Sequence, residues 1–315
     1  MSARSSAAGT AWAGRSRAAF GAWPERWADR WPTAGRGNHR GVTWRWDPTL
    51  YAGSAPHYAR GRVAYPQALA DLLAAELDLD GSGRLLDVGC GPGSLTLLLA
   101  PLVAQATAID ADPDMIAEAK RLAAPAGVRN VRWQVHRAED LPAGLGTFRL
   151  VTFAQSFHWM DRRRVAAAVH GMLEVGGTCM HVHATTHQGV ETSRPLPHPE
   201  PPRAAIADLV RRYLGPQRRA GQGVLSVGTP ADEDDVYRAV GFTGPRRLEL
   251  PGVVVERTAD QVVAAVLSLS GSAPHLFGPR LAAFEADLRR LLHDTSRAGV
   301  FSQHMREIAL DLWHP

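Results

Sequence analysis

The chain has 315 residues, long enough for one large domain or two modest ones, and its 45% hydrophobic and 21% charged residues are ordinary for a globular protein. No apolar run approaches the roughly 18 to 20 residues of a membrane span, so we expect no membrane partner. The two cysteines, Cys90 and Cys179, have neither a zinc-site spacing nor a disulfide framework, which fits a cytoplasmic protein. The formal net charge of +4 is concentrated in residues 1–40, which hold seven arginines. The rest is nearly neutral, and we expect no nucleic-acid partner.

In chain order, residues 1–42 are rich in Ala, Gly, Arg and Trp without a sustained period, which predicts a disordered tail. Leucines at helical spacing follow Pro66 and predict a helix there. Strands and helices then alternate as far as residue 187, which predicts a parallel sheet covered on both faces. The expected strands are 85–89, 106–110, 131–135, 148–154 and 177–184, and the expected helices are 95–102, 113–123 and 162–173.

Five prolines between residues 195 and 202 interrupt this alternation and indicate a stiff linker. Helical patterns follow around 206–214, 232–242, 259–269 and 279–293, and strands are expected at 247–255 and 308–313. We interpret 43–187 as the core and 188–230 with 257–298 as a mostly helical substrate cap. The segments 231–256 and 299–315 are expected to supply the last strands of the core sheet.

The stretch LLDVGCGPG places Gly89, Gly91 and Gly93 between a strand and a helix, which is a typical nucleotide or anion site. Dinucleotide enzymes use G-x-G-x-x-G, but here Ser94 replaces the last glycine. Asp87, inside the strand, would repel a pyrophosphate and suits a ligand with a positive end. Asp110 ends the second strand and is placed to accept hydrogen bonds from both ribose hydroxyls. S-adenosylmethionine, a cationic nucleoside without phosphates, fits this pattern.

The sequence resembles the class I S-adenosylmethionine-dependent methyltransferases in five ordered motifs, which are LLDVGCGPG, AIDADPDMIAEA, AEDLP, FRLVTFAQSFHWMD and MLEVGGT. The resemblance covers about residues 55–185 and is closest to the small-molecule branch that contains ubiquinone/menaquinone-biosynthesis and trans-aconitate methyltransferases. It implies an α/β fold: a Rossmann-like sheet of seven strands with helices on both faces and a mostly helical cap.

The resemblance also implies a site for S-adenosylmethionine. Its members would be Tyr58, Arg62, Asp87, Gly89, Gly91, Gly93, Asp110, Ala111, Ala138, Glu139 and Gln155. The three glycines would let the methionine part lie against the backbone, and Asp87 would orient the loop and the amino group. Asp110 would hold the ribose.

The remaining implied contacts lie at the two ends of the cofactor. Ala111, Ala138 and Glu139 would border the adenine, although Arg137 stands where the family often has an acid. Gln155 would face the methionine carboxylate or the sulfonium. Tyr58 or Arg62, in the lead-in segment (residues 43–66), could bind the carboxylate.

A base for the acceptor is expected at the end of the fourth strand, where His158 lies and could take a proton from a phenol, enol or hydroxyl. Trp159 could wall the pocket, and both residues could instead only shape it. His183, His187 and His275 are further candidates for the substrate pocket. His181, His183 and His187 end the fifth strand and raise a metal alternative, since His181 and His183 share a strand face as chelating residues would. No nearby acid or cysteine pairs with the three histidines in sequence, so we expect no metal.

We therefore expect methyl transfer from S-adenosylmethionine to an O, N or C atom of a small-molecule acceptor. Three alternatives stay open at this point. One is a protein of the same fold that binds the cofactor but catalyses a non-methylating reaction such as a cyclisation. Another, disfavoured by Asp87 and Ser94, is a nicotinamide-dependent oxidoreductase. The third is an interaction module on a degenerate scaffold, with the Trp- and Arg-rich tail as its contact segment. The acceptor, the atom methylated and the oligomeric state do not follow from the sequence.

Overall fold

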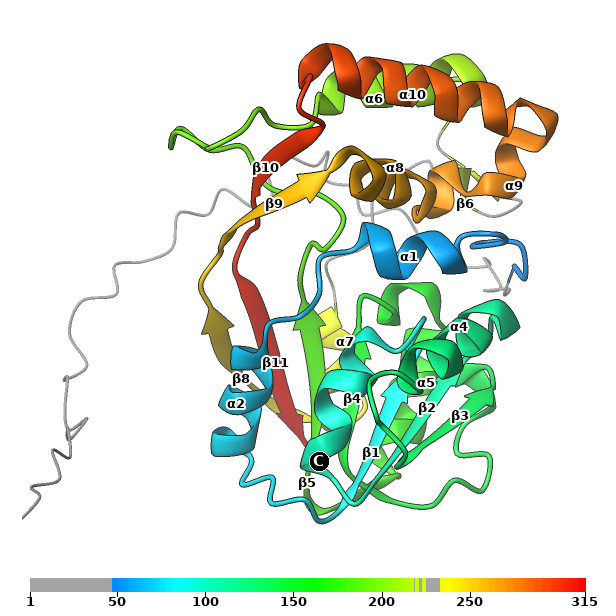
Figure 1. Cartoon of the computed structure of the whole chain (residues 1–315). Helices are drawn as coiled ribbons and strands as arrows, with labels where there is room; N and C mark the ends of the chain where they lie inside the picture. Colours follow the sequence, from blue (N-terminus) through cyan, green and yellow to red (C-terminus); the bar gives the residue numbers. More distant parts are fainter. Residues whose placement is uncertain (1–46, 218, 221–222, 225–232) are drawn as a thin grey trace, which may run out of the picture. The chain divides into compact units, whose positions relative to one another are not determined.

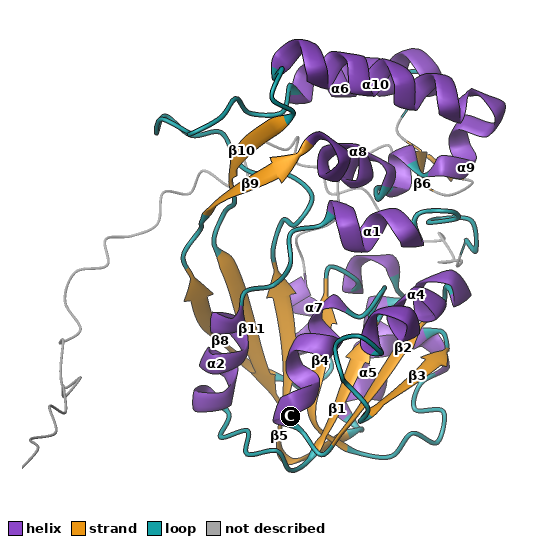
Figure 2. Ribbon diagram, viewed as in Figure 1, coloured by secondary structure: helices purple, strands orange, loops and turns teal. Residues whose placement is uncertain are grey.

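A computed structural model describes residues 47–217, 219–220, 223–224 and 233–315 (Figures 1 and 2). The tail expected at 1–42 lies outside these residues, as does most of the link between 218 and 232. Within the described part, a layered core carries a separate group of helices above the carboxyl ends of its strands (Figure 1).

The core is a mixed sheet of seven strands in the order β3-β2-β1-β4-β5-β11-β8. The first five in this order run parallel, and β11 is antiparallel to both of its neighbours. The strands are β1 (Arg84–Val88), β2 (Gln105–Asp110), β3 (Val131–Val135), β4 (Phe148–Ala154), β5 (Leu173–His183), β8 (Thr243–Leu250) and β11 (Ile308–His314). The predicted Rossmann-like fold class is confirmed.

Helices cover both faces of this sheet because successive side chains of its strands alternate in direction. Leu85 of β1 faces α2 and α3, whereas Leu86 faces α5 and α7. Ala108 of β2 contacts α4. These helices are α2 (Gln67–Glu76), α3 (Ser94–Leu99), α4 (Pro113–Ala123), α5 (Arg162–His170) and α7 (Glu233–Ala239).

Two helix starts follow directly from their sequences. The Asp112 carboxylate accepts from the amides of Asp114 and Met115 before Pro113 opens α4, and Asp161 accepts from the Arg164 amide at the start of α5. The prediction of a single helix over 95–102 is wrong at its C-terminal end. The helix stops at Leu99 and tightens into a 3-10 turn, η2 (Ala100–Leu102), which contains a proline.

The cap consists of α6 (Arg203–Leu214), α8 (Ala259–Leu267), α9 (Pro274–Phe277) and α10 (Leu281–Thr295). They share one apolar cluster that includes Val263, Phe277, Phe284 and Leu288. Four further 3-10 turns lie between these elements. They are η3 (Ala138–Asp140) and η4 (Phe157–Trp159) in the core and η5 (Ser270–Ser272) and η6 (Gly278–Arg280) in the cap.

The strand expected at 247–255 is wrong, because the chain forms two strands there. Pro251 and Gly252 interrupt the pattern, and β9 (Val254–Thr258) leaves the core sheet to pair with β10 (Val300–His304). The segments 231–256 and 299–315 therefore do not belong wholly to the core sheet as expected. Phe301 of β10 packs into the cap cluster instead. Elsewhere β6 (Arg219–Ala220) and β7 (Gly223–Val224) pair as two short antiparallel strands.

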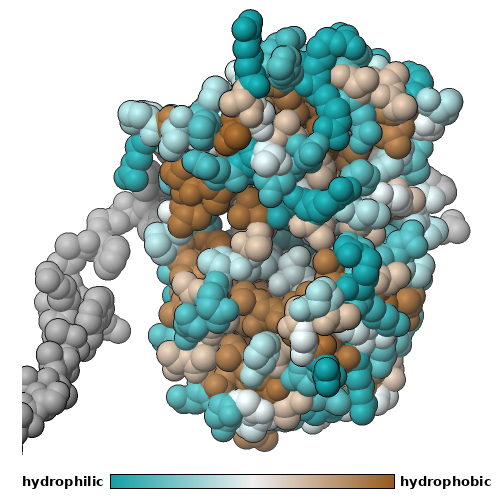
Figure 3. Space-filling view, in the orientation of Figure 1, coloured by the Kyte–Doolittle hydropathy of each residue, from teal (hydrophilic) through white to brown (hydrophobic). Residues whose placement is uncertain are grey.

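No described helix is by itself long and apolar enough to cross a membrane. The bent pair Ala259–Leu267 and Ser270–Thr295 passes that test only when its two parts are taken together, across a bend of 100°. In the space-filling view the surface is hollowed between the cap and the core sheet (Figure 3).

The lead-in holds a helix that the sequence pattern did not predict, α1 (Ala55–Gly61), which lies between the cap and the core (Figure 1). Gly61 is buried against α8 so closely that an added Cβ would lie 2.3 Å from the Ala264 carbonyl carbon. Contact this close between two backbones requires glycine.

We expect Gly61→Ala to lower the free energy of unfolding by about 1–3 kcal/mol, because the methyl group would force α1 away from α8. Chemical denaturation monitored by circular dichroism measures this change. Gly171→Ala is the control, since its nearest neighbour would lie 3.6 Å from the new Cβ and its φ is −75°. Equal unfolding midpoints for both variants would show that the α1–α8 contact is not close.

Candidate functional site

A cavity, partly open to solvent, lies at the carboxyl ends of β1, β2 and β4. The strand order reverses between β1 and β4, which is where open α/β sheets bind ligands. Eleven residues expected at the site line it: Tyr58, Arg62, Asp87, Gly89, Gly91, Asp110, Ala111, Ala138, Glu139, Gln155 and Trp159.

The glycine loop is tied to the end of β2 by Asp110. Its carboxylate accepts from the Gly91 amide at 2.8 Å and from the Asp112 amide at 2.9 Å. Removal from water raises the pKa of Asp110 to about 6, and the two amide hydrogen bonds oppose that rise. The loop adopts positive φ at Gly89, Gly91 and Gly93, where larger residues are strained.

Asp87, the residue two positions before the glycine loop, is 1% exposed and holds the elements on either side of that loop together. It accepts from the Thr96 hydroxyl of α3 at 2.5 Å and from the Thr152 hydroxyl of β4 at 2.7 Å. Burial raises its pKa above the ordinary range, while the two hydroxyls lower it. Asp87 therefore joins β1, α3 and β4, and its expected contact with an amino group stays a prediction.

At the other end of the cavity, Glu139 is 6% exposed, so it is not a surface acid. Its carboxylate accepts from the Asp161 amide at 3.0 Å and lies 3.6 Å from the guanidinium of Arg137. Arg137 does not line the cavity. With Ala111 and Ala138, Glu139 forms a narrow wall beside Asp110.

The lead-in forms the roof of the cavity. Arg62 donates to the Ser268 hydroxyl of the cap at 2.8 Å, and its guanidinium lies 4.4 Å from the centre of the Tyr58 ring. A second nitrogen of the same guanidinium lies 3.3 Å from His187 Nδ1. Arg62 thus connects the lead-in, the cap and the loop after β5.

Gln155 follows β4 with φ of 59°, a left-handed conformation that is uncommon outside glycine. Its amide donates to the Val182 carbonyl of β5 at 3.3 Å. Trp159 packs edge-on to Tyr51 across the cavity, and His158 lies against Trp159 with ring centres 4.9 Å apart. His158 is adjacent to the cavity wall without lining it.

Five expected residues are not brought to the cavity: Gly93, His158, His183, His187 and His275. Gly93 faces the Trp133 ring, which an added Cβ would approach to 2.6 Å, so this glycine serves packing. His275 is exposed and contacts the Ala52 carbonyl. His187 contacts Arg62, and His183 contacts Asp311.

Sequence reasoning missed several lining residues: Leu50, Tyr51, Val63, Tyr65, Cys90, Ser94, Leu95, Met115, His136, Ala154, Ser156, Met160 and Thr186. Tyr51 and Tyr65 flank the lead-in motif that contained Tyr58, and this aromatic density was the available signal. Burial raises the pKa of both phenols well above the ordinary value, so they stay protonated hydrogen-bond donors. The Thr186 and Ser156 positions carry no local signal, because only the folded sheet brings them to the cavity.

Residues 85–177 match a family model described as a methyltransferase domain. An uncharacterized methyltransferase of Mycobacterium bovis is 34% identical over 134 residues, covering 42% of this chain and 51% of the relative. A ubiquinone biosynthesis O-methyltransferase of Xanthomonas campestris is 38% identical over 110 residues, covering 34% and 45%. A solved cyclase structure superposes with a TM-score of 0.48 at 20% identity, covering 85% and 95%. The chain spans about half the length of the curated relatives it matches.

The glycine loop yields a paired prediction, because Gly91 and Gly93 share a positive φ but differ in surroundings. An added Cβ at Gly91 meets nothing within 4 Å, whereas at Gly93 it meets Trp133. We expect Gly91→Ala to cost about 1 kcal/mol of stability from backbone strain alone. Gly93→Ala should cost about 1–3 kcal/mol more. Thermal unfolding measures both, and equal losses would contradict the packing role of Gly93.

Proposed function

We propose that this chain, which carries a methyltransferase domain over residues 85–177, transfers a methyl group from S-adenosylmethionine to a small-molecule acceptor. The observation that carries the proposal is the placement of Asp110 against the glycine loop. Its carboxylate lies at the wall of one cavity with Gly91, where a nucleoside sugar would meet it.

The residues that line the cavity support this cofactor over a dinucleotide. Asp87 and Asp110 both line the cavity beside the loop, and two carboxylates there favour a cation over a pyrophosphate. The open space beside the Gly91 Cα would accept the methionine chain against the backbone. Ala111, Ala138 and Glu139 would border the adenine.

The roof and the strand ends would hold the methionine end. Arg62, or the Tyr58 hydroxyl beside it, would bind the cofactor carboxylate, and Gln155 would face the sulfonium. Asp87 would orient the amino group through the loop that it fixes. These side chains position the ligand and exclude water, which are the main requirements of an in-line displacement.

When bound, the cofactor supplies an electrophilic methyl group on a sulfonium. An O, N or C atom of the acceptor would take that methyl group, with S-adenosylhomocysteine as the leaving group. His158 lies beside Trp159 but does not line the cavity, so it would accept a proton from the acceptor through one intervening water.

A small acceptor is supported by the position of the cavity, which is roofed by Tyr58 and Arg62 of the lead-in and is only partly open to solvent. The relative named as an O-methyltransferase of ubiquinone biosynthesis supports oxygen among the candidate atoms. The two free, buried cysteines, Cys90 and Cys179, support a reducing cytoplasm. Neither the cyclisation nor the nicotinamide alternative is favoured by the matched methyltransferases.

Cofactor affinity should depend on pH through Asp110. Its pKa of about 6 in the free protein means that protonation competes with the ribose below that value. We expect the dissociation constant for S-adenosylmethionine to be constant above pH 7 and to rise about tenfold per unit well below pH 6. Isothermal titration calorimetry between pH 5 and 8 measures this profile.

Asp110→Ala should weaken cofactor binding by at least about 1.5–3 kcal/mol, the usual contribution of a charged hydrogen bond. Asp110→Asn should both weaken binding and flatten the pH profile. Asp114→Asn, which changes an exposed acid of α4, is the matched control and should leave both unchanged. Unaltered affinity in Asp110→Ala would remove this residue from the site.

His158→Ala should lower turnover about 100-fold or more while changing cofactor affinity less than threefold, because a base acts on the acceptor rather than on the cofactor. Steady-state kinetics with release of S-adenosylhomocysteine, set beside calorimetry, separates the two effects. His275→Ala is the control histidine. If turnover and affinity fell together in His158→Ala, the residue would be structural.

A further inference from the structure

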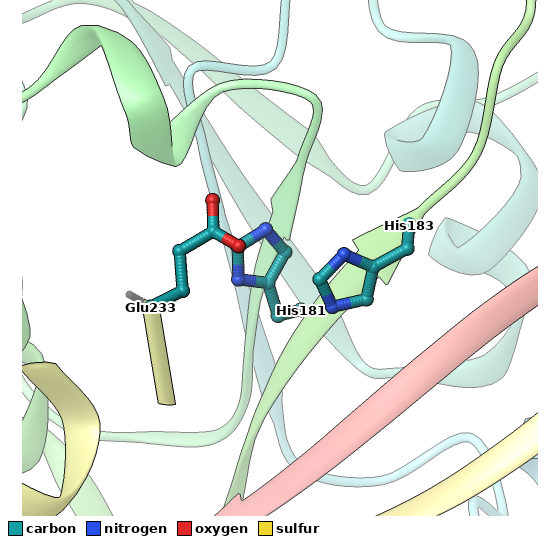
Figure 4. Close-up of side chains that lie close together, drawn as sticks. All are labelled: His181, His183 and Glu233. Carbon is teal, nitrogen blue, oxygen red and sulfur yellow. The ribbon is translucent and has the colours of Figure 1, made fainter. Parts of the chain in front are cut away.

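Three side chains meet at the end of β5, outside the residues that line the cofactor cavity. His181 and His183 project from β5, and Glu233 projects from the first turn of α7 (Figure 4). Each offers one ligand atom, and these atoms all lie within 4.8 Å of one another. Glu233 is fifty residues from His183 in sequence, so the pairing arises only from the fold.

His181 carries an unsatisfied polar atom. The residue is 4% exposed, and its Nδ1 is buried without a hydrogen-bond partner among the residues that the structure describes. Its ring stacks on that of His183 with centres 4.4 Å apart and is flanked by Phe157 and Tyr237. A buried nitrogen lone pair or N–H without a partner is costly, and a bound group would satisfy it.

His183 is oriented by a carboxylate. Its Nε2 lies 2.9 Å from Asp311 Oδ2, and Asp311 is 1% exposed. Arg247 in turn donates two hydrogen bonds of 2.6 Å to the same carboxylate, one to each oxygen. The second nitrogen of His183, Nδ1, is therefore the one left to bind a ligand. A carboxylate that holds the far nitrogen of an imidazole is the usual support of a metal-binding histidine.

We propose that His181, His183 and Glu233 bind one divalent first-row transition metal ion of the Zn²⁺ type. Two imidazoles and one carboxylate are donors that suit this ion, and the set leaves one tetrahedral position open. Bonds of about 2.0–2.2 Å would require the ligand atoms to close to about 3.3 Å, a movement of up to about 1.5 Å. The Glu233 side chain, half-buried at a helix start, can supply that movement.

The inference reverses the expectation that this protein binds no metal. That expectation rested on the lack of an acid near the histidines in sequence, and it grouped His187 with them. In the structure His187 contacts Arg62 instead, and Glu233 takes the third place. The ion would fasten the start of α7 to the carboxyl end of β5, independently of the proposed methyl transfer.

The test uses the full chain after treatment with a chelator and removal of that chelator. Calorimetric titration with ZnCl₂ should show one ion per chain, and Co²⁺ should give the visible absorption of a nitrogen and oxygen site. His183→Ala and Glu233→Gln should each weaken Zn²⁺ binding at least tenfold. His293→Ala, an exposed histidine of α10, and Asp234→Asn, the acid next to Glu233, are matched controls that should bind as the parent does.

Circular dichroism of each variant shows that it is folded before titration. Absence of saturable Zn²⁺ binding by the folded parent chain would overturn the proposal. So would equal affinity in the parent, His183→Ala and Glu233→Gln. A chain that binds Zn²⁺ but not S-adenosylmethionine would refute the proposed function and leave this site standing.

Discussion

The Asp110 carboxylate is the group that holds the glycine loop against the end of β2. Both of its oxygens accept backbone amides, from Gly91 and from Asp112, and removal from water keeps the carboxyl easier to protonate than usual. These hydrogen bonds hold the loop in the conformation with positive φ at Gly89, Gly91 and Gly93, and α3 begins directly after it at Ser94. The sugar of a nucleoside would meet the same carboxylate. One side chain thus links the sheet, the loop and the ligand.

A buried arginine holds together the segments that form the roof of the cavity. Arg257 is 4% exposed and donates to the carbonyls of Gly61, His187 and Gln261. Burial and the nearby Arg62 lower its pKa to about 10, so it is still charged at neutral pH. It joins the end of α1 to β9 and to the loop after β5. The lead-in and the cap are therefore fixed together above the cavity.

Local patterns predicted the core of this protein well. The helix over 113–123 follows from the Asp112 cap and the proline after it, and the glycine loop with Asp110 follows from spacing alone. The rest depended on contacts between distant segments. Helix α1 exists against α8, and Gly93 is required by Trp133. Neither relation is visible in the local sequence. Pro251 and Gly252 were a local signal for the break before β9, but the pairing of β9 with β10 joins segments far apart in the chain.

The central claim is that the cavity over β1 and β2 binds a cationic nucleoside. Titration of the full chain with S-adenosylmethionine and, separately, with NAD at pH 7.5 tests it most directly. The account predicts saturable binding of one S-adenosylmethionine per chain, with S-adenosylhomocysteine competing for the same site and no detectable NAD binding. Saturable binding of NAD, or none of S-adenosylmethionine, would contradict it.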